Sequence, residues 1–134
     1  MLTEFFPDAS QAEVREIIRR LLEENWIPVI AHAERIRACF ADLAFSRDMI
    51  AQGALIQINA FSLEKESNTP IRLTARRLLA NGLVHFIGSD AHRTTHRPPD
   101  VAAGAAHIRA HSMQAEDILH GNALRAFAAP APHP

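Results

Sequence analysis

The sequence predicts an α/β protein in which β/α units alternate around a parallel sheet. Short apolar runs rich in Ile and Val alternate with longer segments in which apolar residues recur every three or four positions. Polar residues follow directly after the apolar runs, as expected where ligands bind at the carboxyl ends of parallel strands. This alternation favours a parallel sheet or barrel with right-handed crossovers.

Composition restricts the class of protein further. The chain has 134 residues, 48% hydrophobic and 22% charged, which fits one globular domain or part of one. A net charge of −1 without a basic block argues against nucleic acid as a partner. Cys39 is the single cysteine, so a disulfide framework is excluded. No long apolar run or signal-peptide pattern is present, so we expect a cytoplasmic protein without membrane insertion.

The first third of the chain reads as strand, helix, strand. Leu2–Phe6 is a short apolar run that contains Glu4 and is followed by turn residues, which predicts a strand. Ser10 and Glu13 have the spacing of a capping box, and apolar residues follow at helical spacing. Trp26–Ala31 is predicted to be a buried parallel strand.

The same alternation continues in the middle of the chain. Apolar positions between Phe40 and Ile50 suggest a weaker helix that ends near Gly53. A strand is expected over Ala54–Asn59. The next helix is expected to begin at Thr69, before a proline, and to end at an Asn-Gly pair.

The last strand and the C-terminal helices complete the pattern. Leu83–Gly88 is predicted to be a strand, and Asp100–Phe127 helical with a break at Gly121-Asn122. Residues 1–127 are therefore assigned to one domain, and residues 128–134, rich in Pro and Ala, to a flexible tail.

Candidate metal ligands lie after the strands. Asp90 and His92 are two positions apart, so a locally extended segment would direct both side chains to one centre. With His32 and Glu4 they provide two imidazoles and two carboxylates, which suit manganese, iron or zinc. For Asp90 and His92 alone, a loop of satisfied polar groups is an equally good interpretation, and the cluster at His32 favours the metal.

Two arginines accompany these candidate ligands. Arg35 follows His32 by three positions, and Arg97 follows His92 by five. Guanidinium groups beside a divalent metal are suited to bind the non-bridging oxygens of a phosphate monoester. For either arginine alone, an exposed surface side chain would be the simpler interpretation.

Several segments together resemble the PHP-type, metal-dependent tyrosine-protein phosphatases of bacterial capsule and exopolysaccharide synthesis. The motifs Ala-His-Ala-Glu-Arg and Ser-Asp-Ala-His carry most of this resemblance. The matching segments occur in the family's order through nearly the whole chain, at Ala31–Arg35, Gln57–Asn59, Ser62–Leu63, His85–His92 and Arg97–Pro99.

The resemblance implies a distorted PHP-type, TIM-like barrel, incomplete in this chain. It implies that Glu4, His32, Asp90 and His92 are metal ligands and that Arg35 and Arg97 are the catalytic, phosphate-binding arginines. The implied cofactors are divalent metal ions, first of all manganese, with iron, zinc and magnesium as alternatives. The implied substrate is a phosphotyrosine protein, a bacterial tyrosine autokinase.

The chain also departs from the family pattern. The His-x-His segment of the family and a further Glu are absent, so the chain resembles the C-terminal half of the domain. We therefore expect a missing N-terminal half or association with another chain, for example as a homo-oligomer. Two alternatives stay open: a phosphatase of a small phosphomonoester such as histidinol phosphate, and a non-catalytic binding module.

Cysteine-based phosphatase chemistry is excluded by the sequence. It requires an Arg six positions after the nucleophilic Cys, and Phe45 occupies that position relative to Cys39. We expect Cys39 to be a buried or inert thiol.

Overall fold

The computed structural model describes residues 1–64, 69–92 and 99–128. Four short parallel strands form a sheet whose order follows the sequence, and β1 and β4 are its outer strands. The predicted α/β class with a parallel sheet is confirmed. The described strands do not close into a barrel, and their bounds are β1 (Leu2–Thr3), β2 (Val29–Ile30), β3 (Leu55–Asn59) and β4 (Phe86–Gly88).

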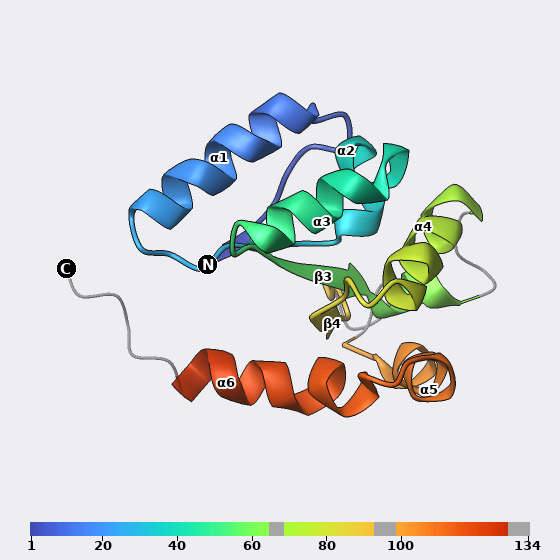
Figure 1. Ribbon diagram of the computed structural model, residues 1–134. Helices are drawn as coiled ribbons and strands as arrows, with labels where there is room; N and C mark the ends of the chain where they lie inside the picture. The colour runs from blue at the N-terminus through green and yellow to red at the C-terminus, as the bar shows by residue number, and fades with distance from the viewer. Residues whose placement is uncertain (65–68, 93–98, 129–134) are drawn as a thin grey trace.

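Helices lie on both sides of this sheet (Figure 1). In that view α1, α2 and α3 lie above the sheet, and α5 and α6 lie below it. Short helical turns follow β2 and β3 directly. The bounds are α1 (Gln11–Glu23), η1 (Ala33–Arg35), α2 (Arg37–Ala41), α3 (Leu43–Ala51), η2 (Ala60–Leu63), α4 (Thr69–Ala80), α5 (Ala102–His111), η3 (Asp117–Gly121) and α6 (Asn122–Ala128).

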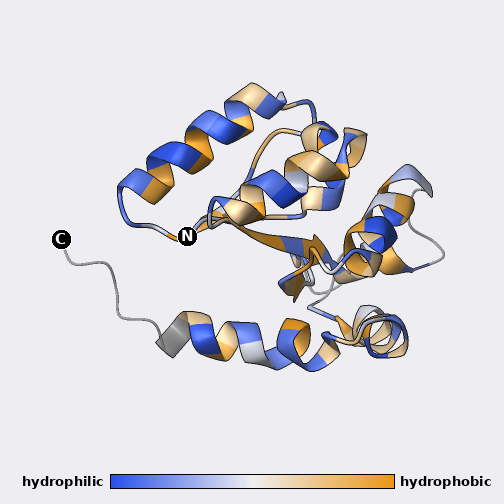
Figure 2. Cartoon of the chain, in the orientation of Figure 1, coloured by the Kyte–Doolittle hydropathy of each residue, from blue (hydrophilic) through white to orange (hydrophobic). Residues whose placement is uncertain are grey.

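Helix α1 confirms the predicted capping box. The Ser10 amide donates to Glu13 Oε2 at 2.8 Å, and the Glu13 amide donates to Ser10 Oγ at 3.3 Å. These bonds satisfy amides that have no partner within the helix. Val14 and Ile18 are fully buried, and Figure 2 shows hydrophobic and hydrophilic residues alternating along α1.

Two strands are shorter than predicted for identifiable reasons. The amide of Trp26 donates to the Leu21 carbonyl, and Asn25 has a φ of 61°, so Trp26 still belongs to the turn that closes α1. Pro28 has no N–H to donate to a neighbouring strand. Only Val29–Ile30 of the predicted strand therefore pairs as β2, and β1 opposite it is limited to Leu2–Thr3.

Strand β4 starts later than predicted because a side chain replaces a strand hydrogen bond. The His85 amide donates to the Ile56 carbonyl at 2.8 Å, and the Ile56 amide donates to His85 Nδ1 at 3.1 Å. The imidazole thus occupies the position of a backbone acceptor, and β4 covers only Phe86–Gly88.

Two helix predictions need correction. The helix predicted between Phe40 and Ile50 is two helices, because Asp42 is extended (φ −150°) and its carboxylate accepts from the Ala44 amide as the N-cap of α3. The break predicted at Gly121-Asn122 is wrong. The backbone there stays helical from the π-helical η3 into α6, and the chain leaves the helical conformation at Ser112, where φ is −130°.

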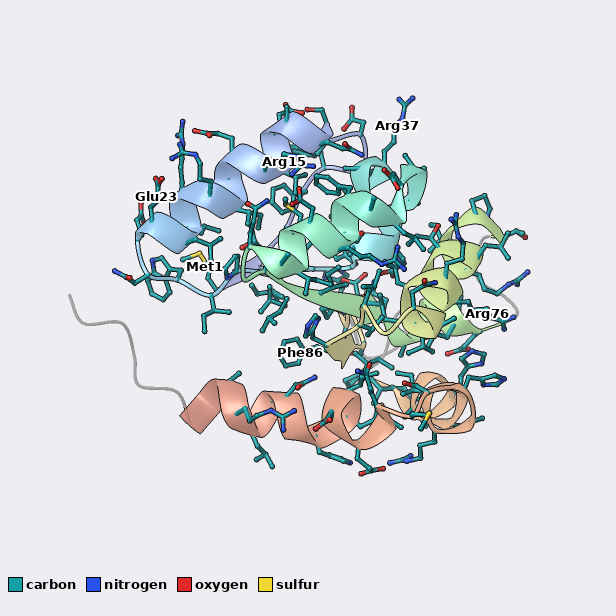
Figure 3. The ribbon with its side chains drawn as sticks, in the orientation of Figure 1. Met1, Arg15, Glu23, Arg37, Arg76 and Phe86 are labelled. Atoms are coloured by element: carbon teal, nitrogen blue, oxygen red, sulfur yellow. The ribbon has the colours of Figure 1, made fainter. Side chains whose placement is uncertain are left out.

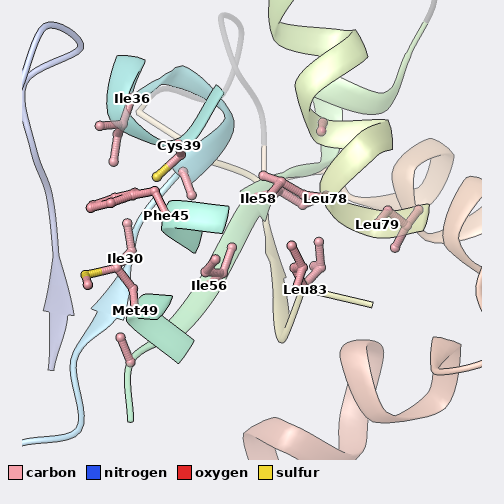
Figure 4. Packing of buried hydrophobic residues seen from close by; sticks show 14 of the residues in the cluster. Ile30, Ile36, Cys39, Phe45, Met49, Ile56, Ile58, Leu78, Leu79 and Leu83 are labelled. Carbon is pink, nitrogen blue, oxygen red and sulfur yellow. The ribbon is translucent and has the colours of Figure 1, made fainter. Parts of the chain in front are cut away.

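One apolar core joins the sheet to its helices (Figure 4). Ile30, Ile56 and Ile58 of the central strands are fully buried. Phe45 and Met49 of α3 lie against one part of this core, and Leu78, Leu79 and Leu83 lie at another, as Figure 4 shows. The core holds the strands in register, so the residues that follow the strands are brought to one edge of the sheet.

Candidate metal and phosphate site

The loop after β2 carries the first group of candidate residues. His32 has a left-handed backbone (φ 35°, ψ 49°) and precedes η1. A non-glycine residue in this region is strained and is held there by its surroundings. The His32 amide donates to Gln57 Oε1 at 2.7 Å, which anchors this loop to β3.

His32 faces Glu4, the residue that follows β1. His32 Nε2 lies 3.4 Å from Glu4 Oε1, and the imidazole is largely buried whereas the carboxylate is exposed. His32 Nδ1 is buried and has no hydrogen-bond partner among the described residues. This imidazole–carboxylate pair joins the ends of two neighbouring strands.

Asp90, two residues after β4, is the second centre of the site. Its backbone is also left-handed, with a φ of 54°. The segment is therefore not extended as predicted, yet Asp90 Oδ1 and His92 Nε2 do lie together, at 3.2 Å. Asp90 Oδ2 accepts from Asn59 Nδ2 at 3.1 Å and lies 3.7 Å from Arg35 Nη1.

Arg35 is partly buried within this group, whereas a nearby arginine is not. The Arg35 side chain is 28% exposed, and its Nε is buried without a hydrogen-bond partner among the described residues. Arg37 is exposed, and Figure 3 shows it projecting outward at the periphery of the molecule. Arg97, the other predicted phosphate-binding arginine, lies outside the described residues.

Glu34 is a buried carboxylate to which sequence reasoning gave no role. Its Oε1 accepts from the Asn59 amide at 3.1 Å and from Ser62 Oγ at 2.6 Å. Burial raises the pKa of Glu34 above its ordinary value, although hydrogen bonds from Ser62 and Asn59 oppose that shift. Glu34 thus ties the loop after β2 to the segment after β3. Its place between His32 and Arg35 was the only sequence signal.

The donor types at this edge of the sheet fit a divalent cation, but the described residues supply them in two separate pairs. Nitrogen and carboxylate oxygen ligands suit manganese, iron, zinc or magnesium. Glu4 pairs with His32, and Asp90 pairs with His92. Among residues 1–64, 69–92 and 99–128, no group of three or more His, Cys, Asp or Glu side chains is positioned to hold a metal ion.

A cavity of about 620 Å³ lies beside one of these pairs. It is bounded by the segment after β1 and by α1, and Glu4 is the one candidate ligand that lines it. The Asp90 and His92 pair does not line this cavity. Cys39 does not line the cavity and belongs to neither of the two pairs of candidate ligands. It is buried, and burial raises the pKa of its thiol to about 11, as expected for an inert cysteine.

Imidazole, carboxylate and guanidinium groups at the carboxyl edge of a parallel sheet are typical of enzymes that act on phosphate esters with divalent cations. The chain belongs to the CpsB/CapC family of capsular polysaccharide synthesis, whose family model matches residues 1–128. No helix in the described parts of the chain is long and apolar enough to cross a membrane.

Relatives with known names support this family assignment. CapC of Staphylococcus aureus is 36% identical over 98 residues, 73% of this chain and 38% of that protein. The tyrosine-protein phosphatase CpsB of Streptococcus pneumoniae is 32% identical over 103 residues, 73% of this chain and 42% of that protein. The tyrosine-protein phosphatase YwqE of Bacillus subtilis is 31% identical over 97 residues, 72% and 38% of the two chains.

A solved structure shows the same fold. The match is to the crystal structures of YwqE from Bacillus subtilis and CpsB from Streptococcus pneumoniae, described as unique metal-dependent tyrosine phosphatases. The TM-score is 0.67 at 28% identity, over 77% of this chain and 42% of the other. This chain therefore spans about two fifths of the length of the relatives that it matches.

Proposed function

We propose that this chain is part of a metal-dependent protein-tyrosine phosphatase that acts in capsular or exopolysaccharide synthesis. The observation that carries the proposal is the meeting of Arg35 with Asp90, whose other oxygen contacts His92, at the edge where His32 meets Glu4. Membership of the CpsB/CapC family and relatives named tyrosine-protein phosphatases support the same activity.

The four candidate ligands would bind divalent metal ions, with manganese as the first choice. Their oxygen and nitrogen donors are the right type, and His32 Nδ1 is a buried ring nitrogen with no other partner among the described residues. Two pairs do not complete a coordination shell of four to six ligands, so further ligands would have to come from other residues. Bound divalent ions would polarise the phosphoryl oxygens and activate water.

The arginines would bind the phosphate group. Arg35 is held beside Asp90, which limits the positions that its guanidinium can take. A planar guanidinium binds two non-bridging phosphate oxygens at once and stabilises the charge that develops on them. We assign the same role to Arg97 on the resemblance of its segment to the family.

The proposed substrate is a phosphotyrosine protein, specifically a bacterial tyrosine autokinase, and the proposed location is the cytoplasm. The distorted barrel belongs to the same proposal, with the four described strands as one sector of it. A small phosphomonoester such as histidinol phosphate is the alternative substrate.

Comparing two substrates tests the proposed activity. With manganese present, we expect faster hydrolysis of a phosphotyrosyl peptide than of histidinol phosphate at equal concentrations. The opposite order would favour the small-molecule phosphatase. A chain that binds manganese and a phosphotyrosyl peptide but releases no phosphate would instead be a binding module.

A further inference from the structure

Two amide side chains connect the two halves of the site. Gln57 and Asn59 point to the same face of β3 because they are two positions apart in a strand. Three hydrogen bonds run through them: His32 N–H to Gln57 Oε1 (2.7 Å), Gln57 Nε2 to Asn59 Oδ1 (3.1 Å), and Asn59 Nδ2 to Asp90 Oδ2 (3.1 Å).

The direction of this chain of hydrogen bonds is fixed by its two ends. A backbone N–H can only donate, so the oxygen of the Gln57 amide must face His32. Gln57 Nε2 then faces Asn59 Oδ1 and the Ile58 carbonyl, the latter at 2.6 Å. Asn59 must in turn direct its NH2 group at Asp90, which as a carboxylate only accepts. Neither amide can turn over without losing bonds on both sides.

The surroundings enforce the same arrangement. Gln57 is 9% exposed and Asn59 is 1% exposed, so water cannot replace a lost bond easily. Gly88 on β4 leaves the space that Gln57 occupies, because a Cβ at position 88 would lie 2.6 Å from Gln57 Nε2. Glu34 Oε1 holds the Asn59 backbone amide at 3.1 Å.

We propose that Gln57 is a positioning residue that, through Asn59, fixes Asp90 relative to His32. The effect of Gln57 on catalysis rests on the proposed function, in which His32 and Asp90 are ligands of the metal site. The hydrogen bonds of Gln57 and Asn59 are independent of the proposed function. His32 and Asp90 both have left-handed backbones, so external contacts of this kind are needed to hold them.

Amide hydrogen exchange tests the hydrogen bonds without metal or substrate. Gln57→Met removes the acceptor of the His32 amide, so this amide should exchange about five- to tenfold faster, beyond any change shared by the whole chain. Gln57→Glu keeps an acceptor but has no N–H. It should leave His32 protected and shift the side-chain NH2 resonances of Asn59. Equal His32 exchange in wild type and Gln57→Met would overturn the proposal.

Thr74→Val is the matched control. Thr74 is also buried, and the substitution removes one hydrogen bond, from Thr74 Oγ1 to the Pro70 carbonyl at 2.9 Å. Thr74 lies on α4, away from the hydrogen bonds of Gln57 and Asn59. It should lower stability without a selective effect on His32. If Thr74→Val accelerates His32 exchange as much as Gln57→Met, the effect is general loosening and the proposal fails.

Manganese-dependent hydrolysis of a phosphotyrosyl peptide tests whether Gln57 affects the proposed metal site. Gln57→Met should raise the manganese concentration for half-maximal activity by about 10- to 100-fold, whereas Thr74→Val should not. An unchanged manganese requirement in Gln57→Met would remove its positioning role. If the wild-type chain shows no hydrolysis, this chain does not form the proposed active site by itself, while the exchange data still decide whether Gln57 holds His32.

Discussion

Arg35 and Arg37 are two positions apart, yet their surroundings differ. Arg35 is partly buried beside Asp90, and Arg37 is exposed. Arg35→Ala should therefore lower manganese-dependent hydrolysis of a phosphotyrosyl peptide about 100-fold or more, because a fixed charge facing the phosphate is lost. Its effect on the free energy of unfolding should be only about 1 kcal/mol, since the ion pair is long and part-exposed.

Arg37→Ala is the control for this prediction, because it removes the same type of side chain two positions away, at the start of α2, without touching the site. Steady-state rates and thermal unfolding of both variants are the measurements. Equal rates in the two variants would show that Arg35 does not act on the phosphate.

Residue chemistry made part of this site predictable. The residue types of His32 and Asp90 and their places after apolar runs were sufficient to single them out. The roles of Gln57 and Glu34 were not predictable in this way. Each makes its decisive contacts with residues about 25 positions away in the sequence, and hydrogen bonds at that separation exist only once the strands are aligned.

At the scale of elements, α5 approaches η2 so closely that Gly104 has no room for a side chain. A Cβ on Gly104 would lie 2.7 Å from Ala60 Cα, a backbone atom that cannot move aside easily. Gly104→Ala should therefore destabilise the chain by about 1 to 3 kcal/mol, although alanine is the better helix former. Denaturant unfolding measures this.

The control for the Gly104 prediction is Ala106→Gly, an exposed position of the same helix. Ala106→Gly should lower the free energy of unfolding by about 0.5 to 1 kcal/mol through helix propensity alone. An increase in stability in Gly104→Ala would mean that α5 does not pack against η2 as described.

The junction of β3 and β4 should make stability depend on pH. Burial lowers the pKa of His85 below its ordinary value, and its Nδ1 must be unprotonated to accept the Ile56 amide. The folded chain then binds fewer protons than the unfolded chain. This contribution is fully present above the unfolded pKa of about 6.5 and is lost as the pH falls from there through the folded pKa.

Urea unfolding between pH 7.5 and 5 measures this dependence. His85→Gln keeps an uncharged acceptor, so its stability should fall less over this range than that of the wild type. Glu34 and His107, whose pKa values are also shifted, are common to both chains and cancel in the difference. Parallel pH profiles would contradict the assigned role of His85.

The predictable elements were those whose signals are local. Helix α1 follows from a capping box and apolar spacing that lie within its own segment. The short extent of β2 depends on the turn at Asn25 and on Pro28, which has no N–H to donate. The short extent of β4 depends on the His85 imidazole, which replaces a backbone acceptor. The division between α2 and α3 had a local signal, the N-cap Asp42, which apolar spacing alone did not reveal.

At the scale of the whole molecule, the parallel sheet brings together residues from three separate strand ends. Glu4 follows β1, His32 and Arg35 follow β2, and Asp90 follows β4. The α/β class was predictable because it depends on alternation along the entire chain. The closed barrel is not formed by the described strands, and the candidate metal ligands lie in two pairs within a chain that spans about two fifths of the length of its relatives.

The central claim is that the groups after the strands form a functional metal and phosphate site. Its most direct test is manganese-titrated hydrolysis of a phosphotyrosyl peptide by the 134-residue chain, beside the Asp90→Ala/His92→Ala double variant. We predict phosphate release that rises with manganese in the wild type and is absent from the double variant. Equal hydrolysis by both chains would contradict the claim, and so would equal manganese binding by both chains if neither releases phosphate.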